Sequence, residues 1–226
     1  MKIELWLIWK EPVSRRRFKI GILQKDEKKY IFKYVNPELD DARKNGFKFY
    51  PGFENITKTY ESESLFTNIA SRLPNSKRKD YLEILNWYNL DINSSEIDIL
   101  IATKGRLLTD NYEFVPAFNL NKIIFDVAGT RHSKDILKCR KMLKINDKLL
   151  LEPENNVKDE NAIKVVYVDE NNERYEIGYV PRYYSKKILE ILKNNVNYSA
   201  MVQSLNFDSS FFDEDITANV KLIINN

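Results

Sequence analysis

The second half of the chain alternates short apolar segments with turn signals, and this pattern restricts the possible folds more than any other feature of the sequence. Asn146-Asp147 and Asn171-Asn172 are turn dipeptides, and Gly129 ends the first apolar segment. Two short helices are predicted, at residues 133–142 and 183–194. Strands are predicted at residues 122–128, 148–152, 161–168, 174–180, 197–205 and 216–224. Such a set predicts a small closed or nearly closed β-barrel of the OB-like kind.

The first half begins with strands and continues with helices. Alternating hydrophobicity predicts an antiparallel meander from residues 2–9, 17–24 and 28–35. A loop rich in turn dipeptides follows, and helices are then predicted at 62–73, 81–88 and 94–103, with Ser62, Ser76 and Ser94 or Ser95 as their caps. The fold class expected for the whole chain is therefore α+β, with one domain at residues 1–120 and a second at 121–226.

Composition excludes several classes of site. Cys139 is the single cysteine and His132 the single histidine, so no internal disulfide, multi-cysteine zinc site or paired-histidine metal site can form within the chain. The net charge of +3 is too small to indicate a nucleic-acid partner by itself. No apolar run is long enough to span a membrane, and the first residues do not have the pattern of a secretory signal. We expect a cytoplasmic protein without a membrane partner.

Three segments of the first half carry a resemblance to a known family. They are FYPGF at 49–53, RLPNSKR at 72–78 and DILIATKGR at 98–106. Together with the meander, they make residues 2–117 similar to the N-terminal subdomain of HipA-type toxins. The chain lacks the phosphate-binding and metal-binding motifs of the kinase body that follows this subdomain in the full-length toxins. The resemblance therefore implies an interaction domain with a protein partner, in an antitoxin-like or defence setting of bacterial type, and no kinase activity.

A second resemblance rests on the order of motifs in the other half. VAGTR at 127–131 is followed by a leucine-rich strand, then by EPENNVKDENAIKV at 152–165 and IGYVPR at 177–182. This order closely resembles the HIRAN domain, over residues 122–195 and beyond. The resemblance implies an OB-like barrel that binds single-stranded DNA and captures free 3′ ends.

The same resemblance implies roles for six residues. Arg131 and Arg182 match phosphate-binding positions, and Asp159 matches an aspartate that contacts the terminal sugar. Tyr179 lies near the end pocket. His132 and Lys158 stand where aromatic residues are usual, so base stacking is weakened at both and Lys158 adds a possible phosphate contact. Asp159 has an alternative role as a turn residue before the next strand.

Charge in the second half is uneven. Residues 131–148 hold seven basic and two acidic residues, whereas 152–176 hold three basic and eight acidic. The two stretches can either form opposite faces or pair with each other across the barrel. We interpret the chain as a non-catalytic protein without cofactor or metal that binds single-stranded DNA or DNA ends. The alternative is an antitoxin-like protein-interaction module that does not bind DNA, and a metal-dependent nuclease at Asp159 is a third reading.

Overall fold

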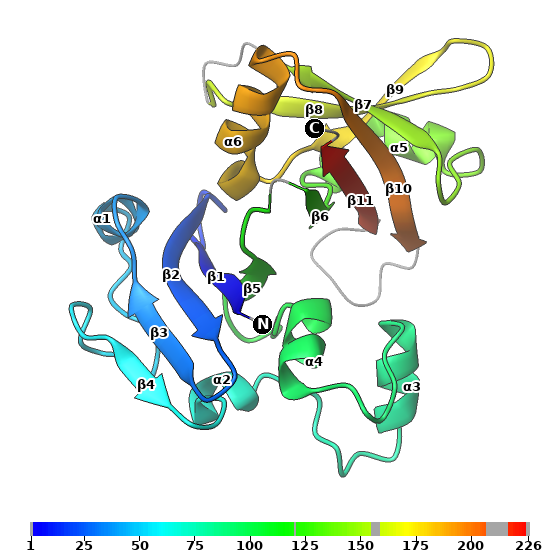
Figure 1. Cartoon of the computed structure of the whole chain (residues 1–226). Helices are drawn as coiled ribbons and strands as arrows, with labels where there is room; N and C mark the ends of the chain where they lie inside the picture. The colour runs from blue at the N-terminus through cyan, green and yellow to red at the C-terminus, as the bar shows by residue number, and fades with distance from the viewer. Residues whose placement is uncertain (1, 120, 155–158, 207–216, 225–226) are drawn as a thin grey trace. The chain divides into compact units, whose positions relative to one another are not determined.

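The computed structural model describes residues 2–119, 121–154, 159–206 and 217–224 and divides into two compact units, Met1–Ala117 and Phe118–Asn226 (Figure 1). Each unit contains one antiparallel sheet with helices. The mixed α and β content with antiparallel sheets agrees with the expected fold class. Within the described residues, no helix is long and apolar enough to cross a bilayer.

The first unit is built on a five-stranded sheet in the order β4-β3-β2-β1-β5. The predicted meander is confirmed, because β1 pairs with β2 and β2 with β3 in antiparallel fashion. Aromatic side chains fill one face of this sheet, and Phe32 stacks on Phe53 at 4.2 Å between ring centroids. The strands are β1 Ile3–Lys10, β2 Arg17–Lys25, β3 Tyr30–Tyr34, β4 Tyr60–Ser62 and β5 Tyr112–Pro116.

The helices of the first unit differ from the predicted ones. They are α1 Glu38–Lys44, α2 Thr67–Ala70, α3 Tyr81–Trp87 and α4 Glu96–Thr103. Helix α1 was missed because it buries only Leu39 and Ala42, which is too short an apolar pattern to stand out between turn dipeptides. The helix predicted from Ser62 was wrong in its start, since Ser62 ends β4 and α2 has four residues.

Two further details of these elements follow from local hydrogen bonding. Helix α4 begins at Ser95, whose side chain forms a reciprocal capping box with Asp98, so Ser95 is the cap of the two that were proposed. Helix α3 has Asp80 at its N-cap position without a side-chain cap, and the predicted cap at Ser76 is wrong.

Strand β5 was missed because Pro116 in its last position is typical of a turn, yet an edge strand tolerates proline there.

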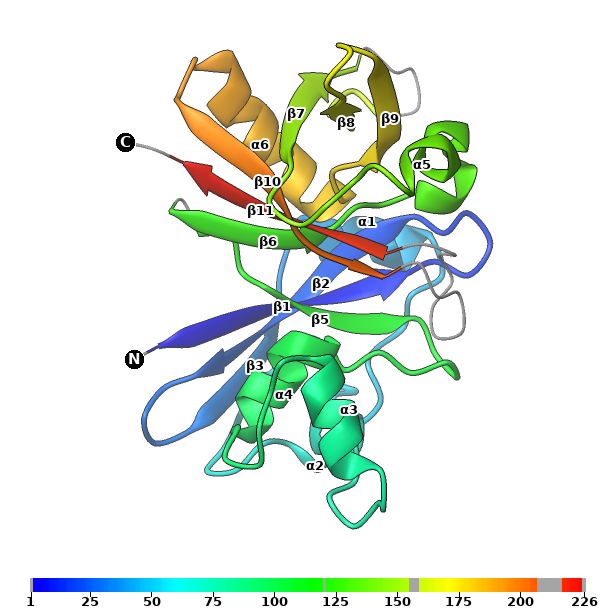
Figure 2. The same ribbon diagram turned by 90° about the vertical axis from the view of Figure 1, so that its right-hand side faces the viewer.

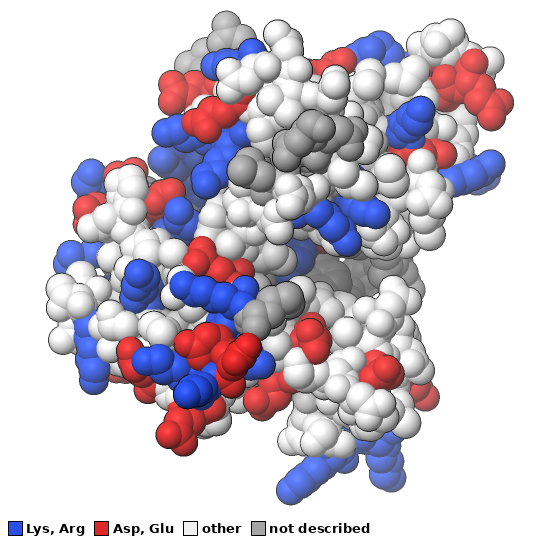
Figure 3. Space-filling model, in the orientation of Figure 1, with Lys and Arg blue, Asp and Glu red and all other residues white. Residues whose placement is uncertain are grey.

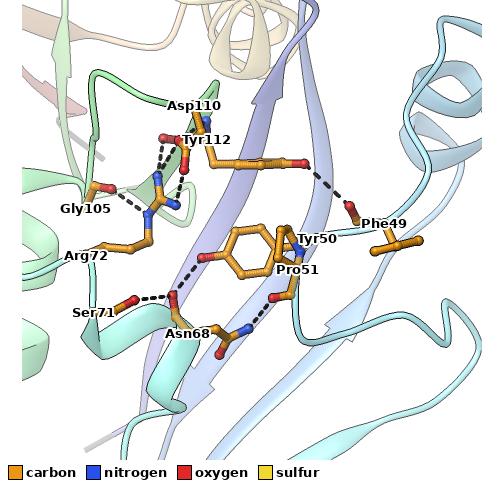
Figure 4. A network of polar contacts seen from close by, with 9 residues as sticks. All are labelled: Phe49, Tyr50, Pro51, Asn68, Ser71, Arg72, Gly105, Asp110 and Tyr112. Carbon is orange, nitrogen blue, oxygen red and sulfur yellow. Dashed lines mark hydrogen bonds and ion pairs between the residues drawn. The ribbon is translucent and has the colours of Figure 1, made fainter.

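Arg72 of the RLPNSKR motif is buried in the first unit and connects two of its segments by hydrogen bonds (Figure 4). Its side chain is 4% exposed and forms two parallel hydrogen bonds to the Asp110 carboxylate, at 2.6 and 2.7 Å. It also donates to the carbonyl oxygens of Gly105, at 2.6 Å, and Tyr112, at 3.1 Å. A buried guanidinium is stable only when its donors are satisfied in this way. This arginine therefore ties the turn after α2 to the segment between α4 and β5.

The second unit is a six-stranded antiparallel sheet in the order β6-β11-β10-β7-β8-β9, curled into half a barrel (Figure 2). Its strands are β6 Lys122–Asp126, β7 Lys148–Pro153, β8 Ile163–Val168, β9 Arg174–Tyr179, β10 Tyr198–Asn206 and β11 Thr217–Ile224. The predicted strands are all present, with ends that differ from the predicted ones by at most two residues. The helical elements are the short 3-10 turn η1 Thr130–His132, α5 Lys134–Cys139 and α6 Arg182–Lys193.

The two edges of this curled sheet meet at one point. Ala128, which follows β6, forms an isolated bridge with Tyr179, the last residue of β9. Helix α6 buries Tyr184, Ser185, Ile188, Leu189 and Ile191, and the ring of Tyr184 lies 6.4 Å from that of Phe125 in β6. The core is apolar on both sides of this contact. The strand pattern predicts a nearly closed barrel. The structure has a half-barrel whose two edges are joined by the Ala128–Tyr179 bridge.

Candidate nucleic-acid interface

The VAGTR and IGYVPR motifs lie side by side along the free edge of β9. The backbone N–H of Ala128 donates to the carbonyl oxygen of Tyr179 at 2.8 Å, and the N–H of Tyr179 donates to the carbonyl oxygen of Ala128 at 2.8 Å. Further along this edge, the Ser133 hydroxyl donates to the carbonyl oxygen of Glu176, and the N–H of Glu176 donates to Asp135 at 3.2 Å. The edge-facing backbone groups of Glu176 and Tyr179 are thus hydrogen-bonded by one continuous segment, residues 128–135.

Two glycines permit this close approach. A Cβ atom on Gly178 would lie 2.6 Å from the Ala128 carbonyl oxygen and 2.6 Å from a methyl carbon of Val127, and the φ angle of Gly178 is +146°. Gly129 has a φ of +74°, and the nearest atom to a Cβ there would be Tyr179 Cδ2 at 3.9 Å. Gly178 is therefore required for both space and backbone conformation, whereas Gly129 is required for conformation alone.

Asp159 and Arg182 face each other at the same end of the sheet. Arg182 Nε lies 3.9 Å from Asp159 Oδ2, and the two side chains are 38% and 22% exposed. The other carboxylate oxygen of Asp159 accepts the N–H of Asn161 at 3.1 Å, and the Asp159 carbonyl accepts the N–H of Ala162. Asp159 thus shapes the turn before β8 with one oxygen and directs the other toward a cation. The turn role and the proposed binding role are compatible.

Tyr179 belongs to a polar cluster with Glu154, Lys164 and Glu176. Its hydroxyl donates to Glu154 Oε2 at 3.2 Å, and Lys164 Nζ lies 2.9 Å from Glu154 and 2.8 Å from Glu176. Burial, together with the carboxylates of Glu176 and Glu154, raises the pKa of Tyr179 to about 12. Hydrogen bonds to the same two carboxylates raise the pKa of Lys164 above its usual range. The Tyr179 hydroxyl is therefore a hydrogen-bond donor at neutral pH.

The sequence analysis did not select Glu154, Lys164 or Glu176. The signal that could have found them is strand pairing, since Lys164 lies opposite Tyr179 in the β8–β9 ladder. Cross-strand neighbours on one face contact each other, so a polar residue opposite a proposed site residue is itself a candidate.

The five predicted residues that the structure describes fall in three segments that meet at one end of the β8–β9 hairpin. Arg131 and His132 lie in η1, directly after the bridge to Tyr179, and His132 is exposed. Val180 donates to the carbonyl oxygen of Ile163, which holds the start of α6 next to the turn containing Asp159. Lys158 lies outside the described residues, as does the side chain of Arg131. The backbone arrangement brings Asp159, Tyr179 and Arg182 together with the η1 turn.

The acidic residues of the stretch 152–176 form ion pairs with basic residues of the same stretch. Arg174 pairs with Glu152, and Lys164 pairs with both Glu154 and Glu176. In the basic stretch, Lys138 pairs with Asp135 at 2.8 Å. These ion pairs lie within each stretch, whereas Asp135 of the basic stretch accepts the backbone N–H of Glu176 in the acidic one, so the two stretches are next to each other along the β9 edge.

Two findings concern metal binding and nucleophilic chemistry in the part of the chain that the structure describes. No three His, Cys, Asp or Glu side chains among the residues that the structure describes come together as a metal site. The Cys139 thiol is buried, and burial raises its pKa to about 11. A thiol with this pKa is protonated at neutral pH and is a poor nucleophile.

Comparison with known proteins bears on the second unit. Residues 120–220 match the family model of the HIRAN domain. This match confirms the resemblance carried by the VAGTR, NAIKV and IGYVPR motifs. No curated protein matches the chain. The similarity of the first half to HipA-type toxins stays a prediction.

Two solved structures are similar to part of the chain. One is the HIRAN domain of human HLTF, with 18% identity and a TM-score of 0.35, covering 46% of this chain and 75% of that chain. The other is a protein from Lactobacillus plantarum, with 20% identity and a TM-score of 0.37, covering 46% of this chain and 92% of that chain.

Proposed function

We propose that the HIRAN-like unit binds single-stranded DNA, holds a free 3′ end beside Asp159 and Arg182, and acts without catalysis. The HIRAN domain is a DNA-binding module, which supports nucleic-acid binding as the general function. The observation that carries the finer proposal is the Ala128–Tyr179 bridge, which brings the two motifs to one end of the hairpin. Without this bridge, nothing would hold the arginines of the two motifs close enough to contact the same DNA strand.

The chemistry of each group fits this proposal. A guanidinium binds phosphate through several donors, and the 3.9 Å separation from Asp159 leaves the donors of Arg182 available. Arg131 supplies the second phosphate contact. The free oxygen of Asp159 accepts a hydrogen bond from a 3′-hydroxyl and repels a 3′-phosphate. Tyr179 and His132 border the terminal base, and Lys158 adds a further cation close to Asp159.

The direct test is the salt dependence of binding. Neutralising one phosphate of a single strand contributes about 0.7 to the slope of log K against log salt. Arg131→Ala and Arg182→Ala are each expected to lower the slope by that amount, measured by fluorescence anisotropy with a 3′-hydroxyl oligonucleotide. Arg174→Ala is the matched control, because Arg174 lies at the opposite end of β9 and pairs with Glu152. An unchanged slope in the double variant Arg131→Ala/Arg182→Ala would refute the phosphate contacts.

The alternative function, a protein-interaction module, is favoured by one feature of the first unit. Leu82 and Trp87 on α3 and Leu108 after α4 are exposed large apolar side chains. Tryptophan is enriched at the centres of protein interfaces. Failure of the wild-type protein to bind any nucleic acid at low salt would support this function for the whole chain.

A further inference from the structure

The exposed face of α6 carries a row of basic side chains. The helix buries most of its apolar residues and leaves Arg182, Lys186, Lys187 and Lys193 exposed, together with one acidic residue, Glu190. Lys and Arg side chains gather over this helix, next to a group of acidic ones (Figure 3). Because α6 begins at Arg182, the row starts at the site proposed for the 3′ end.

Helical spacing puts three of these cations on one stripe. Residues three, four and seven apart lie on the same face of an α-helix, which places Arg182, Lys186 and Lys193 in line. Glu190 lies on this face between Lys186 and Lys193, so the face carries three positive charges and one negative charge. Lys187 lies about 100° around the helix from Lys186. Its ammonium is engaged elsewhere, 5.2 Å from the centre of the Phe118 ring. We call Arg182, Lys186 and Lys193 the α6 stripe.

The dimensions of the α6 stripe suit a nucleic-acid strand. Four residues of α-helix rise about 6 Å, and the seven from Lys186 to Lys193 rise about 10 Å. Each nucleotide of a stacked strand advances by about 3.4 Å along the strand axis. Successive cations of the stripe can therefore neutralise phosphates one to a few nucleotides apart.

We propose that the α6 stripe is a backbone track, along which the single strand runs away from its 3′ end. This inference rests on the proposed function, since Arg182 is shared between the end site and the track. Arg182 contacts the phosphate nearest the 3′ end, Lys186 contacts a phosphate farther toward the 5′ side, and Lys193 contacts one beyond it. The track selects for strand length and charge, not for base sequence, because cations on phosphates carry no sequence information.

The experiment compares the binding of two oligonucleotide lengths by variants of two neighbouring lysines. Binding of 3′-hydroxyl oligothymidylates of three and eight nucleotides is measured by competition anisotropy for the wild type, Lys186→Ala and Lys187→Ala. Both lysines are exposed on the same helix, so equal melting temperatures are expected for the two variants. We expect Lys186→Ala to weaken binding of the eight-nucleotide strand about fivefold and to lower its salt slope by about 0.7. Binding of the three-nucleotide strand, and all binding by Lys187→Ala, should match the wild type.

Other outcomes overturn the track. Equal binding by Lys186→Ala and Lys187→Ala at both lengths, with a wild type that binds normally, refutes the track and leaves the end site standing. An equal loss at both lengths in Lys186→Ala places this lysine in the end site and also refutes the track. A wild type that binds neither oligonucleotide refutes the proposed function and the track together.

Discussion

Gly178→Ala perturbs the Ala128–Tyr179 bridge, which joins the edges of the half-barrel. The added Cβ would lie 2.6 Å from the Ala128 carbonyl oxygen, where no real Cβ contact is tolerated, so the bridge must shift. Overpacking of this kind costs about 1–3 kcal/mol. A φ of +146° for a residue other than glycine costs about 1–3 kcal/mol more. The expected loss of about 2–6 kcal/mol is a large part of the ~5–15 kcal/mol that stabilises a typical domain.

Gly129→Ala is the matched control for this prediction. Its φ of +74° imposes backbone strain of about 1–2 kcal/mol, but the nearest atom is 3.9 Å away and nothing has to move. Two measurements compare the variants: the free energy of unfolding in urea, and the rate of hydrogen exchange at the backbone amides of Ala128 and Tyr179. All three tryptophans lie in the first unit, at 6, 9 and 87, so their fluorescence reports whether that unit is unaffected.

We expect faster exchange at both amides in Gly178→Ala and a stability loss greater than that of Gly129→Ala. Weaker binding of single-stranded DNA should accompany it, because the bridge positions the η1 turn beside Tyr179. Equal stability of the two variants, with unchanged exchange at Ala128 and Tyr179, would refute the role assigned to the bridge.

Three further predictions concern stability, ionisation and catalysis. Arg72→Met should destabilise the first unit by about 3–5 kcal/mol in urea unfolding, because the partly buried Asp110 loses its bidentate partner, whereas Arg78→Ala, at an exposed pair, should unfold like the wild type. Tyr179 should ionise near pH 12 in an ultraviolet difference titration against Tyr179→Phe. Glu154→Gln/Glu176→Gln should lower that pKa, and an unchanged pKa would show that the carboxylates do not act on the hydroxyl. The purified protein should neither bind ATP nor transfer its phosphate; a nucleotide-dependent rise in melting temperature would contradict this.

A pH effect is expected at the β9 edge. The pKa of Asp135 is lowered, first by its hydrogen bond with Lys138 and then by the Glu176 N–H that it accepts. A lowered pKa contributes stability above the ordinary value of 3.8, and this stability is lost as the pH falls through the lowered pKa. Acid unfolding of Asp135→Asn should therefore begin from a lower stability at pH 7 and depend less on pH below 4. A pH dependence identical to that of the wild type would refute the contribution of this carboxylate.

The strands of the second unit could be predicted because their apolar residues alternate or run between strong turn signals. Strand β7 is an example of such a run, with three consecutive leucines after the Asn146-Asp147 turn, of which Leu149 and Leu151 are buried and Leu150 is exposed. In the first unit the same reasoning missed α1 and β5. A seven-residue helix with two buried positions and an edge strand ending in proline leave little periodic signal.

Motif order proposes residues for the candidate site but does not give their contacts. Motif order selected Asp159, Tyr179 and Arg182, yet the long-range bridge that unites them depends on how the sheet curls. The partners Glu154, Lys164 and Glu176 depend on strand register, which is fixed only once β7, β8 and β9 are paired. The role of Arg72 also required the structure, because its carboxylate partner lies 38 residues along the chain.

End discrimination at Asp159 tests the central proposal most directly. Equilibrium binding is measured for two single strands that differ only in carrying a 3′-hydroxyl or a 3′-phosphate, with the wild type and Asp159→Asn. A charge-assisted hydrogen bond is worth about 1.5–3 kcal/mol, so the wild type should prefer the hydroxyl end by roughly tenfold or more. Asp159→Asn should reduce this preference, because the amide removes the repulsion of the phosphate. Equal binding of both ends by the wild type, unchanged in Asp159→Asn, would contradict capture of a 3′ end at this site.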